Sequence, residues 1–378
     1  MCHSPSSRIK PYVSYGERDF LLSDGKLKKT SKPTIDDVAA LSGVARATVS
    51  RVLNGGPNVR EEVRQRVLKA VDKLQYKVNM QARFLAGGKT QVLGLVYASD
   101  LDSEPNPFYH SGLELGALRA CAEAGFQLLM HTVNQHSLGK TAKIIELVDS
   151  RRCDGLILTP PFSDDCDLLR ELEKRNCPVV CISPGLDAQK VASGVGIDDE
   201  VAGYEMTRYM LSLGHKKFGF IKGLEGHLSA EERYSGFRRA IAEAGISERD
   251  VMVMRGNFTF RSGVETTAAI LNNGHRPSAV ICANDDMAVG ALFSAHKIGL
   301  NIPQDLSIVG FDDTPVSEII WPPLTTVNQP LKTIGYRAVE MIVERIKAGK
   351  TATGPMPVRF DVVAHKVVMR ESASAPQG

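Results

Sequence analysis

The sequence lacks any long hydrophobic run. No stretch of about eighteen apolar residues occurs along the chain, and no basic start leads into a shorter apolar segment. A transmembrane helix needs about twenty consecutive apolar residues, and a secretion signal needs the basic start and the apolar segment together. The sequence therefore predicts neither feature, and we expect a cytoplasmic protein.

Catalytic and metal-binding motifs are also missing. The sequence contains no GxSxG, GxxxxGKS/T or HExxH pattern, and Gly194–Gly196 lacks the third glycine of a dinucleotide site. The nine histidines form no ligand cluster, and His215 precedes a predicted strand, where we expect it at the surface. The seven cysteines form no CxxC pair, which favours reduced core thiols over a zinc site or disulfides. We therefore expect no enzyme, no cofactor and no metal.

Composition predicts two or three domains and an uneven distribution of charge. The 378 residues exceed one average domain, and 43% hydrophobic with 24% charged residues suits a sizeable core. Residues 33–89 hold ten Lys/Arg and five Asp/Glu, and residues 1–32 hold seven and three. Because the formal net charge is only +3, the remaining residues are acidic. A basic N-terminal part on an acidic body suits phosphate binding by that part alone.

The stretch Thr34–Asn54 (TIDDVAALSGVARATVSRVLN) predicts two short helices joined by a tight turn. Thr34 is a good N-cap, with Asp37 three residues later. The apolar stripe of the first helix is Ile35, Val38, Ala39 and Leu41. In the second helix, Arg46–Leu53, valines and leucine share one face, and small and basic residues share the other. This pattern indicates a helix-turn-helix whose second helix enters a DNA major groove. A pair that only packs a core is disfavoured, because two arginines and two hydroxyls share the exposed face.

Residues 34–78 are the predicted DNA-binding headpiece. Its third helix follows from apolar residues that recur every three or four positions: Val59, Val63, Val67, Val71 and Leu74. Residues 79–90 are predicted as a hinge and linker, with a helix at Asn79–Ala86 that is too short to be stable alone. Residues 1–33 show no sustained period and are predicted as a disordered arm. A mis-called start codon and a basic arm that adds DNA affinity are the alternatives.

From Gln91 onward, apolar runs of strand length alternate with helical patterns. The predicted strands are 92–98, 127–133, 155–160 and 179–183, then 195–199, 218–223, 251–256, 279–285 and 306–313. Helices are predicted at roughly 109–124, 140–151 and 164–176, and a further helix, Lys332–Ala348, precedes a final strand pair within 357–369. Apolar strands joined by helices imply parallel sheets covered on both faces. The predicted fold is therefore α/β, with two doubly wound lobes in residues 91–372 and a tail at 373–378.

These motifs resemble the LacI/GalR family of bacterial transcriptional regulators. The resemblance is carried by DVAxxxGVxxxTVSRVLN, by Val59–Tyr76 and by VNMQARFLAGG, and it continues from Gln91 to about Glu371. It implies an effector-binding core similar to periplasmic sugar-binding proteins, with the effector in a cleft between the lobes. It also implies a homodimer on a near-palindromic operator. The chain would cross between the lobes near 184–194, 323–329 and 350–357.

The resemblance implies roles for residues of the headpiece and the hinge. The base-reading positions match Arg46, Ala47 and Arg51, and the phosphate positions match Thr48, Ser50 and Asn54. The hinge positions match Asn79, Ala82 and Leu85, with Leu85 as an apolar wedge in the minor groove. The chain departs from the family at Ala45, where a Ser or Thr cap is usual, and at Val78, where Pro is usual.

Polar and aromatic residues near predicted strand ends are the candidate effector contacts. Carboxylate, amide and guanidinium groups suit the hydroxyls of a sugar, and aromatic rings can stack on its apolar face. The candidates are Phe108, Tyr109, Ser163, Arg233, Asn257, Phe258, Asn284 and Asp312. By resemblance, Arg233, Asn284 and Asp312 match effector contacts, and Ser163 stands where some sugar-responsive members have an acidic residue. Asp285 and Asp313 could instead cap following helices.

The sequence thus predicts a DNA-binding regulator, most simply a repressor of carbohydrate-utilisation genes controlled by a sugar-like effector. A regulator of the same family that needs a corepressor, either a small molecule or a partner protein, is an open alternative. A sugar-binding transport component is disfavoured by the helix-turn-helix and by the missing signal peptide. An enzyme on an α/β core is disfavoured by the missing catalytic motifs.

Overall fold

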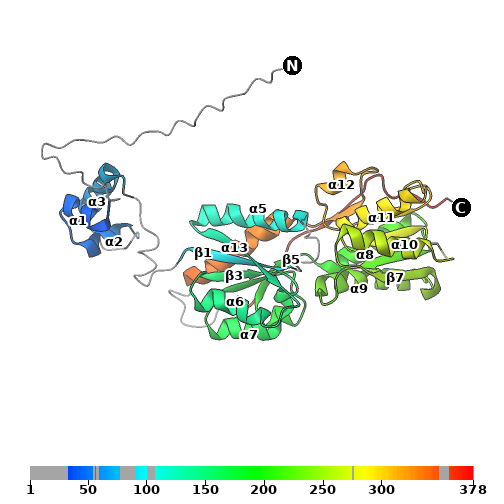
Figure 1. Ribbon diagram of the computed structural model, residues 1–378, viewed down its shortest axis with the longest axis horizontal. Helices are drawn as coiled ribbons and strands as arrows, with labels where there is room; N and C mark the ends of the chain where they lie inside the picture. Colours follow the sequence, from blue (N-terminus) through cyan, green and yellow to red (C-terminus); the bar gives the residue numbers. More distant parts are fainter. Residues whose placement is uncertain are drawn as a thin grey trace, which may run out of the picture. The chain divides into compact units, whose positions relative to one another are not determined.

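The computed structural model describes residues 33–53, 56, 59–76, 90–99, 107–274, 276–348 and 357–377. The chain divides into two units, Met1–Gly87 and Gly88–Gly378, whose elements are labelled in Figure 1. The predictions for residues 1–32, for Asn54 and for the hinge Asn79–Ala86 lie outside the described residues. No helix within the described ranges is long and apolar enough to cross a membrane.

The headpiece contains the three predicted helices. They are α1 (Ile35–Ser42), α2 (Arg46–Leu53) and α3 (Glu61–Leu74). Thr34 and Asp37 form the predicted capping box, since each side chain bonds the other residue's backbone N–H. The core consists of Val38, Val49, Val52, Val67 and Ala70. The prediction for Leu41 is wrong: it is 44% exposed, because Val38 and Ser42, four residues apart, form the buried face of α1.

Lobe 1 of the second unit is a parallel sheet with helices on both faces (Figure 1). The strand order is β11-β5-β4-β3-β1-β2. The strands are β1 (Val92–Ser99), β2 (Gln127–Asn134), β3 (Gly155–Leu158), β4 (Val179–Ile182), β5 (Ser193–Gly196) and β11 (Phe360–Val362). The helices are α5 (Pro107–Ala124), α6 (Lys140–Asp149), α7 (Cys166–Lys174) and α13 (Leu331–Ala348), with short 3-10 turns η1 (Phe162–Asp164) and η2 (Ala188–Lys190). Side chains of β1 alternate between two cores: Leu93 and Leu95 face α5 and α13, and Val96 faces α6 and α7.

Lobe 2 repeats this architecture with a smaller sheet of order β7-β6-β8-β9. The strands are β6 (Phe218–Lys222), β7 (Val251–Arg255), β8 (Ala279–Cys282) and β9 (Ser307–Val309). The helices are α8 (Asp199–Ser212), α9 (Leu228–Glu243), α10 (Phe260–Leu271), α11 (Asp285–Lys297) and α12 (Val316–Ile319), with a 3-10 turn η3 (Glu248–Asp250). A separate antiparallel pair joins β10 (Thr326–Asn328) to β12 (Lys366–Val368). The predicted doubly wound, two-lobed α/β fold is therefore confirmed.

Three segments connect the lobes, and two of them differ from the prediction. The segment before α13 was expected near 323–329 and does lead from β10 into that helix. The crossing predicted near 184–194 is wrong, because β5 pairs with β4 in lobe 1 and the chain leaves only after Gly196. The crossing predicted near 350–357 is also wrong: β11 still pairs with β5, and β12 pairs with β10, so the chain crosses at residues 363–365. The predicted strand pair within 357–369 is consequently two strands in different sheets.

The C-terminal segment packs against lobe 2 and buries His215. This side chain is 1% exposed, with Nδ1 2.9 Å from the Ser278 hydroxyl and Nε2 2.9 Å from the Ser374 carbonyl. The surface position expected for His215 is therefore wrong. A residue that lies 159 positions away along the chain covers it, and no local pattern reports such a contact.

Candidate functional site

The outer face of α2 carries the predicted base-reading side chains. Arg46, Ala47 and Arg51 are exposed, and Thr48 and Ser50 are half-buried. The opposite face is held in the core by valines, because Val49 and Val52 are 0% and 4% exposed. The helix thus presents its basic, small-residue face to solvent, as a helix that enters a major groove must.

An ion pair on this face leaves Arg46 free to change partner. The Arg46 guanidinium lies 3.4 Å from Asp36, and the two side chains are 66% and 64% exposed. An exposed pair of this kind contributes at most about 1 kcal/mol, less than a bidentate contact to guanine provides. In contrast, Arg64 of α3 donates to the Gly56 carbonyl at 3.2 Å.

In the second unit, Arg233 of α9 is the centre of a buried charged network. Its Nε donates to Asp199 at 2.7 Å, and its Nη1 donates to the Ala283 carbonyl at 2.7 Å. Nη1 also lies 3.9 Å from Asp312, and the guanidinium carbon lies 3.7 Å from the centroid of the Phe311 ring. All three charged side chains are at most 7% exposed. A buried guanidinium needs such partners, because an unpaired buried charge is very costly.

Asp312 occupies an unusual backbone position at the junction of the lobes. Its φ is 110°, a region that side chains rarely adopt. Its N–H donates to the Val327 carbonyl at 2.9 Å, and its carboxylate accepts from Gln329 Nε2 at 2.9 Å. Burial raises the pKa of Asp312 well above its usual value, and the Arg233 charge opposes this rise. The strain fits a residue whose carboxylate must lie at one defined place.

Tyr109 brings lobe 1 to the same place. It lies in the first turn of α5, and burial raises the pKa of its hydroxyl, with Asp312 raising it further and Arg233 lowering it. Its ring is therefore within electrostatic reach of the Arg233 network. We call Tyr109, Asp199, Arg233 and Asp312 the inter-lobe site. Three of these residues are among the predicted contacts, and Asp199 is an addition.

Asn284, Asn257 and Phe258 belong to one supporting structure beside this site. The Asn284 side-chain oxygen Oδ1 accepts from the Met287 N–H at 3.0 Å and caps α11, and its side-chain Nδ2 donates to the Phe258 carbonyl at 3.0 Å. The Asn257 carboxamide oxygen accepts from the Thr259 hydroxyl at 2.6 Å and forms a turn. Phe258 has a φ of 67° and packs against His227, with ring centroids 5.2 Å apart. Asn284 therefore holds the loop that carries the Phe258 ring.

Asp285 and Asp313, which could have capped helices, accept hydrogen bonds from other residues instead. Asn284, one residue earlier, is the cap of α11. Asp285 is completely buried and accepts from the Thr314 N–H at 2.8 Å and from the Thr326 hydroxyl at 2.6 Å. Asp313 accepts from Arg370 at 2.7 Å and from Asn328 at 2.9 Å. Both carboxylates therefore connect separate loops of lobe 2.

Several buried polar atoms of the two lobes have no hydrogen-bond partner among the described residues. Within the described part of the chain, these include Ser163 Oγ, Asp164 Oδ2 and Ser183 Oγ of lobe 1, together with His227 Nε2 and Gln329 Oε1. Buried polar groups are nearly always hydrogen-bonded in proteins, so such a set suits a polar ligand or water. The Phe108 side chain is half-buried and bonds none of these atoms. The sequence did not single out Asp164, Asp199 or Gln329, although Asp164 ends the 3-10 turn after β3 and Asp199 begins the helix after β5.

Comparison with known proteins agrees with this organisation. The family of bacterial regulatory proteins named after lacI matches residues 34–79, and a periplasmic binding protein-like domain matches residues 207–373. Catabolite control protein A of Priestia megaterium is 32% identical over 312 residues, which are 82% of this chain and 92% of that protein. The structure of the transcriptional regulator CelR–cellobiose complex is 32% identical, with a TM-score of 0.66 over 90% of this chain and 100% of that one.

The lac repressor dimer bound to operator and the anti-inducer ONPF is a further structural neighbour. It is 26% identical, with a TM-score of 0.75 over 91% of this chain and 100% of that chain. The matches to the two relatives that are 32% identical cover 92% and 100% of their lengths. In this chain the match to the regulatory family precedes the match to the periplasmic binding protein-like domain. The chain therefore belongs to the LacI family of bacterial regulatory proteins, which are DNA-binding transcriptional regulators.

Proposed function

We propose that this protein is a cytoplasmic repressor of carbohydrate-utilisation genes that binds a near-palindromic operator as a homodimer. The observation that carries the DNA-binding part is the exposed basic face of α2 on a three-helix headpiece. One helix-turn-helix reads only a few base pairs, so a second copy related by two-fold symmetry must supply the rest of the site. We propose no catalytic role, since the relatives named above are regulators.

Within the headpiece, the proposed roles separate base reading from positioning. Arg46 and Arg51 would each contact guanine, and Ala47 would allow close approach or contact a thymine methyl. Thr48, Ser50 and Asn54 would bind phosphate and set the register on the duplex. In the hinge, Asn79, Ala82 and Leu85 would complete the minor-groove contact. The match of the family model to residues 34–79 supports the headpiece part of this assignment.

A small sugar-like effector suits the inter-lobe site. Asp312 and Arg233 can hydrogen-bond hydroxyl groups, and Tyr109 and Phe258 provide aromatic rings for the apolar face of a sugar. Ligands at sites between lobes change the lobe arrangement by their differential affinity for the two states. The relative solved with cellobiose and the lac repressor solved with ONPF support an effector of this kind.

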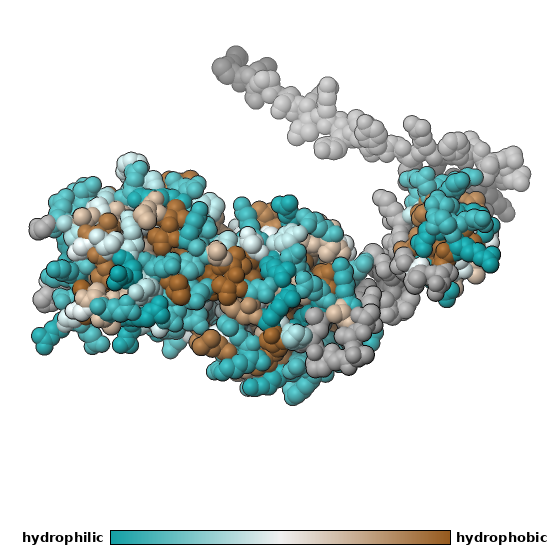
Figure 2. All heavy atoms as spheres, turned by 180° about the vertical axis from the view of Figure 1, so that it is seen from behind, coloured by the Kyte–Doolittle hydropathy of each residue, from teal (hydrophilic) through white to brown (hydrophobic). Residues whose placement is uncertain are grey.

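Exposed apolar side chains on both lobes support the proposed dimer. Leu115 and Leu118 of α5 are 54% and 46% exposed. Phe260 and Phe293 form an edge-to-face pair 5.7 Å apart, and both are more than a third exposed. Figure 2 shows hydrophobic residues at the surface of both lobes on the face in view. Large apolar side chains at a surface are typical of protein–protein interfaces.

The first step of the experiment identifies the operator by selection, so that no target sequence has to be chosen beforehand. Full-length protein is used to enrich duplexes from a random pool, and the affinity for the enriched duplex is then measured with and without a panel of sugars. We expect a near-palindromic sequence and at least one sugar that weakens binding. A sugar that strengthens binding would support the corepressor alternative instead. Failure to enrich any sequence would contradict the DNA-binding proposal.

A further inference from the structure

Strand β2 is the last strand of the lobe 1 sheet, and no described strand pairs with its outer edge. The sheet order places β2 beside β1 alone, and the two strands pair along their whole length, from Gln127 to Asn134. In a parallel pair, alternate residues direct their backbone N–H and C=O groups away from the partner strand. The described part of lobe 1 therefore presents backbone hydrogen-bonding groups at this edge.

A cavity of about 390 Å³ is lined by β2 and by helix α6, and this volume is typical of small-molecule sites. We call this cavity the edge pocket. Its lining residues are His131, Thr132, Val133, Asn134, Lys143, Glu146, Leu147 and Arg152. Four of them are consecutive in β2. Because the side chains of a strand alternate between two faces, a run of four neighbours indicates that the backbone edge of β2 borders the pocket.

The edge pocket combines an apolar floor with a polar rim. Val133 and Leu147 are each 2% exposed and belong to the core between the sheet and helices α6 and α7. His131 is half-buried, and the side chains of Lys143 and Arg152 are exposed. A short carbon skeleton can therefore rest on the floor while its polar groups reach the rim.

Cations outnumber carboxylates at this rim. Lys143 and Arg152 carry positive charge, and Glu146 alone of the lining residues is acidic. Neither Lys143 nor Arg152 forms an ion pair with a described residue. Asp149, the acidic residue nearest before Arg152 in the sequence, pairs instead with Arg175 at 3.1 Å. Two cations without an acidic partner, beside the open edge of a strand, suit an anion.

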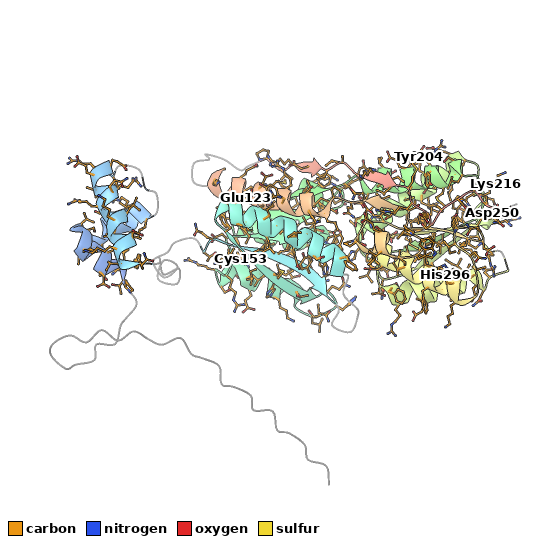
Figure 3. The ribbon with its side chains drawn as sticks, turned by 90° about the horizontal axis from the view of Figure 1, so that it is seen from above. Glu123, Cys153, Tyr204, Lys216, Asp250 and His296 are labelled. Carbon is orange, nitrogen blue, oxygen red and sulfur yellow. The ribbon has the colours of Figure 1, made fainter. Side chains whose placement is uncertain are left out.

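The edge pocket is separate from the inter-lobe site. All of its lining residues belong to lobe 1, and none of them is part of the inter-lobe site. Figure 3 shows Cys153, the residue after Arg152, in the half of lobe 1 that lies away from lobe 2. Both sites can therefore be occupied at the same time, by ligands of different chemistry.

We propose that the edge pocket is a second ligand site, which binds small organic anions through a phosphate or carboxylate group. The anion receives charge-assisted hydrogen bonds from Lys143 and Arg152, and further hydrogen bonds from the His131 ring and the backbone edge of β2. The carbon skeleton of the ligand covers Val133 and Leu147. This ligand is additional to the sugar-like effector, and the proposal does not depend on that effector.

Isothermal titration of the full-length protein tests this proposal. Glycerol 3-phosphate is the phosphate probe, citrate is the carboxylate probe, and glycerol is the uncharged comparison. All titrations use one ionic strength, because salt screens interactions between exposed charges. We expect at least one of the two anions to bind and glycerol not to bind. If neither anion binds, or if glycerol binds as tightly as the anions, the proposal is overturned.

Matched variants locate the binding, since the basic headpiece also attracts anions. Lys143→Gln and Arg152→Gln each remove a cation from the edge pocket and should weaken anion binding roughly fivefold or more. Lys140→Gln and Arg151→Gln are the controls, because they remove the same charge from nearby positions that do not line the pocket. Each control should change the affinity by about twofold or less.

Glu146→Gln should have the opposite effect. It removes the one carboxylate that lines the edge pocket, so repulsion of the bound anion falls and the anion should bind more tightly. Far-ultraviolet circular dichroism checks the fold of every variant. Equal weakening in the test variants and the controls, or weaker binding in Glu146→Gln, would indicate only a general attraction to basic surfaces and would overturn the assignment.

Discussion

Replacing Arg233 by methionine should lower the free energy of unfolding far more than the same replacement of an exposed arginine on the same helix. The variant keeps an unbranched chain but leaves Asp199 and Asp312, both at most 3% exposed, without their cation. Removal of one partner from a buried ion pair costs about 3–5 kcal/mol, because a buried charge is left uncompensated. The guanidinium's contact with Phe311 is lost as well.

Arg239→Met provides the matched comparison. Arg239 also lies on α9, pairs with Glu200 at 2.9 Å and covers the Tyr204 ring at 4.3 Å. Its side chain and that of Glu200 are 43% and 42% exposed, so solvent screens the pair and its loss should cost at most about 1 kcal/mol. Urea unfolding followed by far-ultraviolet circular dichroism measures both differences.

The pH dependence of the stability of Arg233→Met tests the same network a second time. In Arg233→Met, burial without a cation should hold the pKa values of Asp199 and Asp312 above their unfolded values. A carboxyl whose pKa is higher in the folded state lowers the free energy of unfolding at a pH above that pKa. This loss is reversed as the carboxyl becomes protonated on acidification. The deficit relative to wild type should therefore shrink between pH 7.5 and pH 5.5. A variant no less stable than Arg239→Met, or a deficit that grows at the lower pH, would refute this account of the network.

Three further changes test the headpiece and the hinge. Arg51→Ala should lose about 1–3 kcal/mol of discrimination between operator and random DNA, whereas Ser50→Ala should weaken binding to both duplexes alike. Fluorescence anisotropy on both duplexes measures the two effects. An equal loss of affinity on both duplexes for Arg51→Ala would argue against base reading. Thr34→Ala removes the capping box and should cost about 1 kcal/mol of headpiece stability in thermal unfolding, with Thr34→Ser retaining it. Leu85→Ala should lose operator affinity and still bind effector in calorimetric titration; wild-type affinity for the operator would remove the proposed wedge.

Much of the fold follows from the sequence because both lobes bury their central strands on two faces. A strand such as Ala279–Cys282 is then a continuous apolar run and can be recognised directly. Strand β5 was assigned to the wrong lobe because Ser193–Gly196 includes two glycines and only one large apolar residue. The sequence did not predict the pairing of β11, because its partner strand β5 lies far away in the sequence.

The candidate site was predicted only in part, because local patterns do not report tertiary partners. Arg233 and Asp312 were found by resemblance, and their proximity required the structure. Asp285 could be taken for a helix cap because it stands where α11 begins, but its partners Thr314 and Thr326 lie 29 and 41 residues later.

The measurement that tests the central proposal most directly is operator affinity as a function of effector for wild type and Asp312→Asn. The substitution preserves shape and can keep the bond from Gln329, but it removes a charge from the inter-lobe site. With a sugar identified by the panel, wild-type affinity for the selected operator should change by roughly 5- to 150-fold. Asp312→Asn should bind the operator as wild type does and show little response to the sugar. If Asp312→Asn responds like wild type, or if the sugar binds without changing operator affinity, control of DNA binding from the inter-lobe site is contradicted.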